Sequence, residues 1–118
     1  KFDDYQNVIL NEIHIQFATP VWAYDVARVG TQLAVDAKWG IYHVGSTDFM
    51  NRLQLASKVL SYLPGHKCSM SGVLTKDLGQ KAARPLLSGH ISAKFLSEYP
   101  DFQFHNVDHY LQQKLNKQ

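Results

Sequence analysis

Hydrophobic residues recur at every third or fourth position in a segment near the N-terminus, which is the spacing of an amphipathic helix. This segment begins between Pro20 and Asp25 and runs to about residue 37. Asp25 lies near its start, where a carboxylate suits the positive end of the helix dipole. We therefore predict a helix here whose buried face contains Val26, Val29 and Leu33.

A second segment with helical spacing covers residues 51–63. Asn51 and Gln54 have the spacing of a capping box, in which each side chain satisfies a backbone N–H of the other residue. Pro64 and Gly65 mark the end of the segment, because proline does not continue a helix and glycine ends one. The predicted helix has a buried face formed by Leu53, Ala56, Val59, Leu60 and Leu63.

Three segments favour strands. Residues 12–17, "EIHIQF", alternate between polar and apolar side chains, which is typical of a half-buried strand. In residues 40–46, "GIYHVGS", successive side chains would point to opposite faces of a strand that is bounded by two glycines. We expect His43 there to be a hydrogen-bonded core histidine. Residues 66–74, "HKCSMSGVL", carry the weakest of the three patterns.

Residues 1–10 are expected to be the end of a helix. Two further helices are expected at "SAKFLSEY" with Ser92 as its cap and at "NVDHYLQQKL" with Asn106 as its cap. Residues 75–85 have no periodicity and are predicted to form a loop. Strands separated by helices indicate an α/β fold, and three strands are few for a complete doubly wound domain. We therefore expect residues 1–118 to be one unit that adds to a larger sheet protein.

Composition narrows the class of protein. The chain has 118 residues, of which 45% are hydrophobic and 19% charged, as in a single globular domain. The net charge of +2 is spread along the chain, which argues against a nucleic-acid or membrane partner. No apolar run approaches the roughly 20 residues that span a bilayer. The single cysteine, Cys68, excludes an internal disulfide and favours a reducing, cytoplasmic location.

No catalytic set is evident. The sequence contains no glycine-rich turn of the kind that holds a dinucleotide, so no cofactor site is expected within it. Tyr110 and Lys114 have the Y-x-x-x-K spacing of short-chain dehydrogenases, but six tyrosines make a chance match common. We interpret Tyr110 as a core aromatic residue and Lys114 as a surface charge.

Metal binding and nucleophilic catalysis find equally little support. His105 and His109 share one face of a predicted helix, but two histidines are too few for a zinc site, and a solvated helix start is the simpler interpretation. Cys68 lies among small residues and is expected to be an inert buried thiol. We therefore predict neither a metal site nor a catalytic residue in this chain.

Arg84 is the best candidate for ligand binding. It lies in the predicted loop beside Pro85, and the chain contains only three arginines. A guanidinium on a rigid loop offers paired donors to phosphate oxygens. The alternative is a surface arginine that pairs with a carboxylate.

The order of these segments resembles the C-terminal, substrate-binding part of the dTDP-4-dehydrorhamnose reductase family, a group of extended short-chain dehydrogenases. The resemblance is carried by "TPVWAYDVARVGTQLA", "GIYHVGSTDFMNRLQLASKVL" and "KAARPLLSGHISAKF". It covers about residues 10 to 110. The matching residues are Thr19, Pro20, Asp25, Ala27, Gly40, Tyr42, His43, Asn51, Ala56, Arg84, Pro85 and Phe95.

The resemblance implies a small mixed α/β portion that binds a nucleotide sugar. The catalytic Tyr–Lys pair and the site for NADP(H) or NAD(H) would then lie in an N-terminal Rossmann domain outside this chain, so the chain alone is not expected to turn over substrate. Arg84 matches a loop arginine that reaches the diphosphate. Thr19 lies in the loop that borders the cleft. Trp22, next to it, either faces the cleft or packs at the start of a helix.

The sequence leaves two alternative functions open. The same fold family includes a regulatory subunit without catalysis, so a binding or regulatory module is possible. An epimerase or dehydratase that acts on a UDP- or GDP-sugar is the other alternative. The expected partners are a nucleotide sugar, the Rossmann domain and, for a homo-oligomer, a second copy of the chain.

Overall fold

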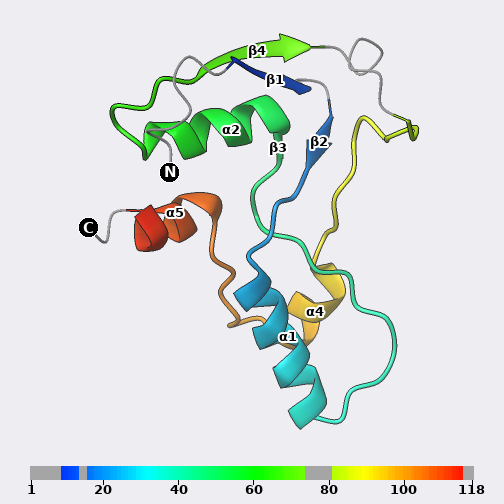
Figure 1. Cartoon of the computed structure of the whole chain (residues 1–118). Coiled ribbons are helices and arrows are strands. Elements are labelled where there is room, and N and C mark those ends of the chain that lie inside the picture. The colour runs from blue at the N-terminus through cyan, green and yellow to red at the C-terminus, as the bar shows by residue number, and fades with distance from the viewer. Residues whose placement is uncertain (1–8, 14–15, 74–80, 116–118) are drawn as a thin grey trace.

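The computed structural model of the chain describes residues 9–13, 16–73 and 81–115 (Figure 1). Strands and helices are mixed along the chain, which confirms the predicted α/β class. Their order is β1 (Ile9–Ile13), β2 (Phe17–Ala18), α1 (Ala23–Val35), β3 (Met50–Asn51), α2 (Arg52–Ser61), β4 (Ser69–Val73), α4 (Ala93–Glu98) and α5 (Val107–Leu115).

The longer sheet pairs β1 with β4 in parallel, in a register that runs from Ile9 opposite Ser69 to Ile13 opposite Val73. Parallel strands need a long crossover, and here it contains α1, β3 and α2. Helix α2 lies along this pair of strands and contacts both of them (Figure 1). The strand predicted at residues 66–74 is therefore confirmed as β4.

The second sheet joins three distant segments around β2. Phe17 pairs with Asn51 of β3 in an antiparallel register. On its other side, the N–H of Phe17 donates to the carbonyl of Leu86 at 2.7 Å. The N–H of Ser88 donates to the carbonyl of Phe17 at 2.9 Å. Residues 86–90, which we call the 86–90 segment, thus extend the sheet edge beyond its named strands.

Helix α1 is confirmed close to its predicted bounds, but of its predicted buried face Val29 is buried and Val26 is exposed. Helices α2 and α5 begin close to the predicted positions. At α2, Gln54 N–H donates to the Asn51 side chain at 2.7 Å, and Asn51 N–H donates to the Gln54 side chain at 2.9 Å. This is the predicted capping box. At α5, the N–H of His109 donates to the side chain of Asn106 at 2.8 Å, which confirms the predicted cap.

Helix α4 is also confirmed, but its predicted cap is wrong. Ser92 holds the N-cap position without a side-chain bond to the helix. Its hydroxyl instead donates to the carbonyl of Gly45 at 2.9 Å and accepts from the N–H of Gly45 at 3.0 Å. Ser92 is buried by this contact, so it joins two loops.

The predicted strand at residues 40–46 is wrong, because these residues form an irregular segment. Their backbone is held by side chains and not by a neighbouring strand. The ammonium of Lys94 donates to the carbonyl of Ile41 at 3.2 Å, and Ser92 binds Gly45. The side chain of His43 is exposed and its ring stacks on His90 at 5.1 Å, so it is not a core histidine.

Other expectations were met only in part. The predicted strand at residues 12–17 is divided between the end of β1 and the start of β2. Residues 9 and 10 belong to β1, and the rest of the helix predicted in residues 1–10 lies outside the described residues. Residues 81–85 form a loop as predicted, and the rest of that predicted loop, residues 75–80, lies outside the described residues. Cys68 is half-buried and directly precedes β4.

The buried apolar side chains of the described residues come from four helices. Phe95 of α4 is fully buried, and its ring contacts those of Tyr99 and Phe102 at 4.8 and 4.9 Å. Among the side chains whose burial the structure describes, the other buried apolar ones are Val29, Leu60 and Leu111, from α1, α2 and α5. The molecule is flat, with extents of 50 × 39 × 19 Å.

Candidate functional site

Thr19 holds the loop that follows β2 to the 86–90 segment. Its hydroxyl accepts from the N–H of His90 at 2.9 Å and donates to the carbonyl of His90 at 3.4 Å. Together with the two bonds at Phe17, these contacts fix the 86–90 segment along β2. The predicted site residue Thr19 is therefore also a structural clamp.

A cavity of about 570 Å³ lies beside this clamp, and we call it the loop cavity. Its walls come from three segments far apart in the sequence, and several of its side chains carry hydroxyl groups. Two glycines permit the close approach of these segments. A Cβ on Gly45 would overlap the carbonyl of His90, and one on Gly89, whose φ is +113°, would lie 2.7 Å from the Thr19 hydroxyl. The cavity is lined by Thr19, Gly45, Ser46, Thr47, Phe49 and residues 87–92.

Arg84 precedes the 86–90 segment by two residues and is exposed. Its guanidinium has no hydrogen bond or ion pair to another described residue, and it does not line the loop cavity. Arg84 thus lies just before the segment that Thr19 holds, and the structure shows no direct contact between the side chains of these two residues. Sequence analysis named both residues as candidates but did not predict the clamp at His90.

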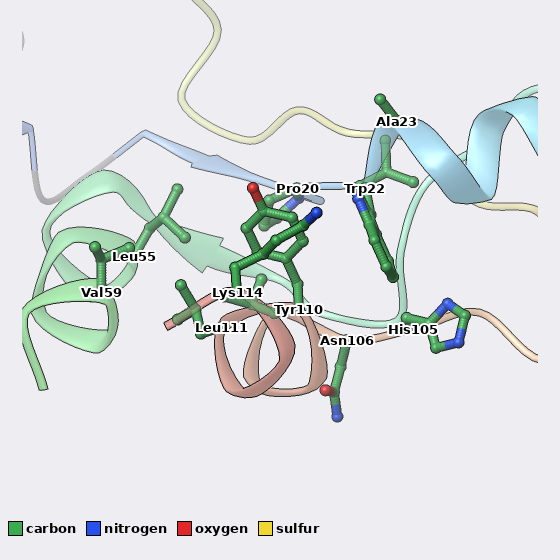
Figure 2. A pocket seen from close by; sticks show the side chains of 12 residues that line it. Pro20, Trp22, Ala23, Leu55, Val59, His105, Asn106, Tyr110, Leu111 and Lys114 are labelled. Carbon is green, nitrogen blue, oxygen red and sulfur yellow. The ribbon is translucent and has the colours of Figure 1, made fainter. Parts of the chain in front are cut away.

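Trp22 lies elsewhere, in a second cavity of about 420 Å³ that we call the aromatic cavity (Figure 2). Its indole ring meets the rings of Tyr110 and His105 edge to face, each at a centroid distance of 5.3 Å. Leu55 and Val59 of α2 approach from the opposite side (Figure 2). Trp22 therefore packs at the start of α1, as one predicted alternative held, and also lines a cavity.

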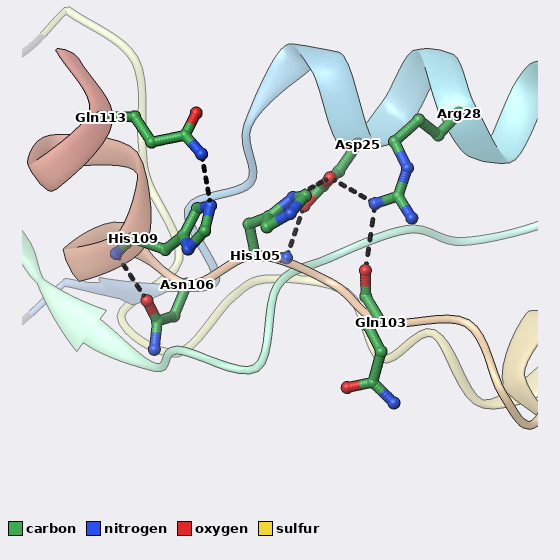
Figure 3. A network of polar contacts seen from close by, with 7 residues as sticks. All are labelled: Asp25, Arg28, Gln103, His105, Asn106, His109 and Gln113. Atoms are coloured by element: carbon green, nitrogen blue, oxygen red, sulfur yellow. Dashed lines mark hydrogen bonds and ion pairs between the residues drawn. The ribbon is translucent and has the colours of Figure 1, made fainter.

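Asp25 anchors a polar network at the start of α1 (Figure 3). The carboxylate has no exposed surface. It accepts from the N–H of His105 at 2.7 Å and from Arg28 at 2.9 Å, and it lies 2.7 Å from Nδ1 of His105. Arg28 also donates to the carbonyl of Gln103 at 3.0 Å. The network thus ties α1 to the segment before α5.

Burial alone would raise the pKa of Asp25, because it disfavours the charged form. The hydrogen bonds from His105 and Arg28 outweigh that effect and hold the pKa below its usual value. A carboxylate saturated in this way is poorly suited to accept a proton from a substrate, so its role is structural. Sequence analysis assigned Asp25 to the helix dipole and missed its burial. The available signal was its position four residues before Val29, which is buried on the same helix face.

Of the two histidines that were predicted to share a helix, His105 lies before α5 and His109 lies on it. The rings of His105 and His109 stack at 4.4 Å, and Nδ1 of His105 is engaged by Asp25. Within the described ranges, His, Cys, Asp and Glu form no group of three or more that could hold a metal. Lys114 is exposed, as predicted, whereas Tyr110 is only half-buried against Trp22 and so meets the prediction of a core aromatic residue in part.

The described turns that lead from a strand into α1 and into α2 lack the glycines of a dinucleotide-binding loop. The turn between β2 and α1, residues 19–22, contains no glycine, and β3 passes directly into α2. A dinucleotide needs a glycine-rich turn between strand and helix so that the backbone can approach its pyrophosphate. None of the helices in these ranges is long and apolar enough to cross a membrane.

Three solved structures of dTDP-4-dehydrorhamnose reductases have a similar fold. The enzyme from Clostridium acetobutylicum has a TM-score of 0.82 and 18% identity, over 96% of this chain and 39% of that one. The Bacillus anthracis enzyme, solved with NADP, has a TM-score of 0.81 and 22% identity, over 94% and 39%. For the Yersinia enterocolitica enzyme the TM-score is 0.75 and the identity 15%, over 98% and 42%. The chain thus spans about two fifths of these proteins.

No curated protein sequence matches the chain. A family model does match it, over residues 5–116, and that model is described as the RmlD substrate binding domain. The match includes the clamp at Thr19, both cavities and the Asp25 network. Because it extends over nearly the whole sequence, the chain belongs to the family of RmlD substrate-binding domains.

Proposed function

We propose that the chain is the nucleotide-sugar-binding part of an NAD(P)-dependent reductase of the dTDP-4-dehydrorhamnose type. The observation that carries this proposal is the family match over residues 5–116, which assigns the chain to a substrate-binding domain. The fold shared with three reductases supports it. The reduction itself requires a cofactor site and a proton donor, which we assign to a separate Rossmann domain.

Within this proposal Arg84 binds the diphosphate. Its exposed guanidinium has no other partner in the part of the chain that the structure describes, so it is available to phosphate oxygens. Thr19 contributes by holding the 86–90 segment, and the hydroxyl and peptide groups of the loop cavity suit the hydroxyls of a sugar. Trp22 lines the other cavity, and its contact with the nucleotide sugar stays a prediction.

The proposal predicts that Arg84→Ala weakens binding of a dTDP-hexose by about one to two orders of magnitude, which is the range for a hydrogen bond to a charged group. Isothermal titration of the native polypeptide with the dTDP-hexose measures this. Lys81→Ala removes an exposed cation from the same loop and should leave the affinity unchanged. Equal affinity of wild type and Arg84→Ala would contradict the assigned role of Arg84.

Two further measurements separate the alternatives. Competition with UDP- and GDP-hexoses should be weaker than with a dTDP-hexose. Stronger competition would favour an epimerase or dehydratase. Oxidation of NADPH or NADH by the native polypeptide with a dTDP-4-keto-hexose should be measurable. Binding without any such turnover would favour the regulatory module.

A further inference from the structure

The aromatic cavity is separate from the loop cavity, because no residue lines both. Its volume of about 420 Å³ falls within the range of small-molecule sites, about 300–1,000 Å³. Leu55 and Val59 of α2 and Leu111 of α5 form an apolar floor, and Trp22 and Tyr110 form an aromatic wall. Such a floor and wall favour the burial of a flat apolar ring.

Polar atoms of this wall lie at one side of the cavity. Figure 2 shows the indole nitrogen of Trp22, the hydroxyl of Tyr110 and the ammonium of Lys114 on that side. Each of these groups can donate a hydrogen bond. Across residues 9–13, 16–73 and 81–115, none of the three has a hydrogen-bond or ion-pair partner. The cavity therefore presents donors that would suit an acceptor group on a ligand.

Near the cavity, the carboxylates are paired with cations and one ammonium group is left without an ion-pair partner among the described residues. Asp25 is neutralised by Arg28 at 2.9 Å, and Asp108 by Lys58 at 2.8 Å. Lys114 remains, with its ammonium 5.9 Å from the centre of the Trp22 ring and no carboxylate partner among the described residues. A cation at the rim of an apolar cavity favours a ligand whose acceptor group is an anion.

We propose that the aromatic cavity binds a small planar aromatic anion, such as an aryl carboxylate or aryl sulfonate. The ring lies between the wall of Trp22 and Tyr110 and the floor from α2. The acid group accepts hydrogen bonds from Lys114, Trp22 and Tyr110. This site uses neither Arg84 nor the loop cavity, to which the proposed function assigns the nucleotide sugar, and of the predicted substrate-binding residues it includes only Trp22.

NMR titration with naphthalene-1-sulfonate tests this site directly. The chain contains two tryptophans, Trp22 in the cavity and Trp39, whose side chain is 90% exposed. Trp39→Phe assigns the two indole N–H signals. We expect the signal of Trp22 to shift to saturation and that of Trp39 to stay in place. Uncharged naphthalene-1-sulfonamide has the same ring and should bind about three- to tenfold more weakly, because it lacks the charge.

Lys114→Gln should weaken the binding of the sulfonate by a similar factor and leave the affinity for the sulfonamide unchanged. Lys67→Gln, which removes another exposed lysine outside the cavity, should change neither affinity. Arg84→Ala should also have no effect, which separates this site from the proposed diphosphate contact. The proposal is overturned if Trp22 shows no saturable shift, if Trp39 shifts instead, or if Lys114→Gln binds the sulfonate as tightly as the wild type.

Discussion

A single carboxylate connects two distant parts of the chain. Asp25 has no exposed surface and accepts its hydrogen bonds from Arg28, three residues ahead, and from His105, 80 residues away. Such a group is costly to bury unless it is paired. Because the pKa of Asp25 is held below its usual value, the charged form is favoured by folding. The network should therefore stabilise the protein at neutral pH.

Asp25→Asn is expected to lower the free energy of unfolding at pH 7 by about 2–3 kcal/mol, because a buried charged hydrogen-bond partner is lost while Arg28 stays in place. A carboxyl group whose pKa is lowered by folding contributes fully above its unfolded pKa, near 4. The contribution disappears as the pH falls through the folded pKa. Urea unfolding at pH 7 and at pH 3 measures both effects, and the difference from wild type should shrink at pH 3.

Asp101→Asn serves as the control, since Asp101 is exposed and should give no comparable loss. A loss for Asp25→Asn that is equally large at pH 3 would show that packing, and not the charge, is responsible.

Helices and strands differ in how much of their structure is local. The capping box of α2 needs only Asn51 and Gln54, three residues apart, so the sequence alone predicts its start. The segment at residues 40–46 has the alternation of a strand, but a strand also needs a neighbour with free backbone groups. Its backbone is instead bound by Ser92 and Lys94, which are about fifty residues away. That arrangement depends on tertiary contacts that no local pattern contains.

Asn51→Ala is expected to lower the free energy of unfolding by about 1 kcal/mol, because it removes the side-chain half of the capping box. Asn51→Asp should retain most of the stability, since aspartate accepts the same hydrogen bond from Gln54 N–H. Urea unfolding followed by circular dichroism measures both variants. If Asn51→Asp loses as much as Asn51→Ala, the contribution comes from another contact of the asparagine amide.

At the scale of the whole molecule, the chain is extended for its length. Its radius of gyration is 17.0 Å, whereas a compact domain of this size has about 13–14 Å. The segments around the loop cavity are held together by a few bonds between loops, above all those of Thr19 and Ser92. The sequence identifies Thr19 and Arg84 as candidates, but the cavity arises from three segments whose meeting it does not reveal.

The close approach at Gly45 predicts a sharp difference between two glycines. Gly45→Ala should lower the free energy of unfolding by about 1–3 kcal/mol, because the new methyl group overlaps the carbonyl of His90. Gly30→Ala, inside α1 with no atom near the new methyl group, should raise it by about 0.5–1 kcal/mol. Thermal unfolding of both variants measures this. Equal effects would mean that the loops at Gly45 can separate without cost.

The pairing of early with late segments also sets the order in which this chain can fold during synthesis. Ile9 pairs with Ser69, the hydroxyl of Thr19 is hydrogen-bonded to His90, and the carboxylate of Asp25 is hydrogen-bonded to His105, so each early residue needs a partner that is synthesised much later. A ribosome therefore releases β1, Thr19 and Asp25 well before these partners exist, although β2 can pair earlier with β3. Until those partners are made, the backbone of β1, the hydroxyl of Thr19 and the carboxylate of Asp25 lack these hydrogen-bond partners, so the three contacts form only after residues 69–73, 90 and 105 have been added.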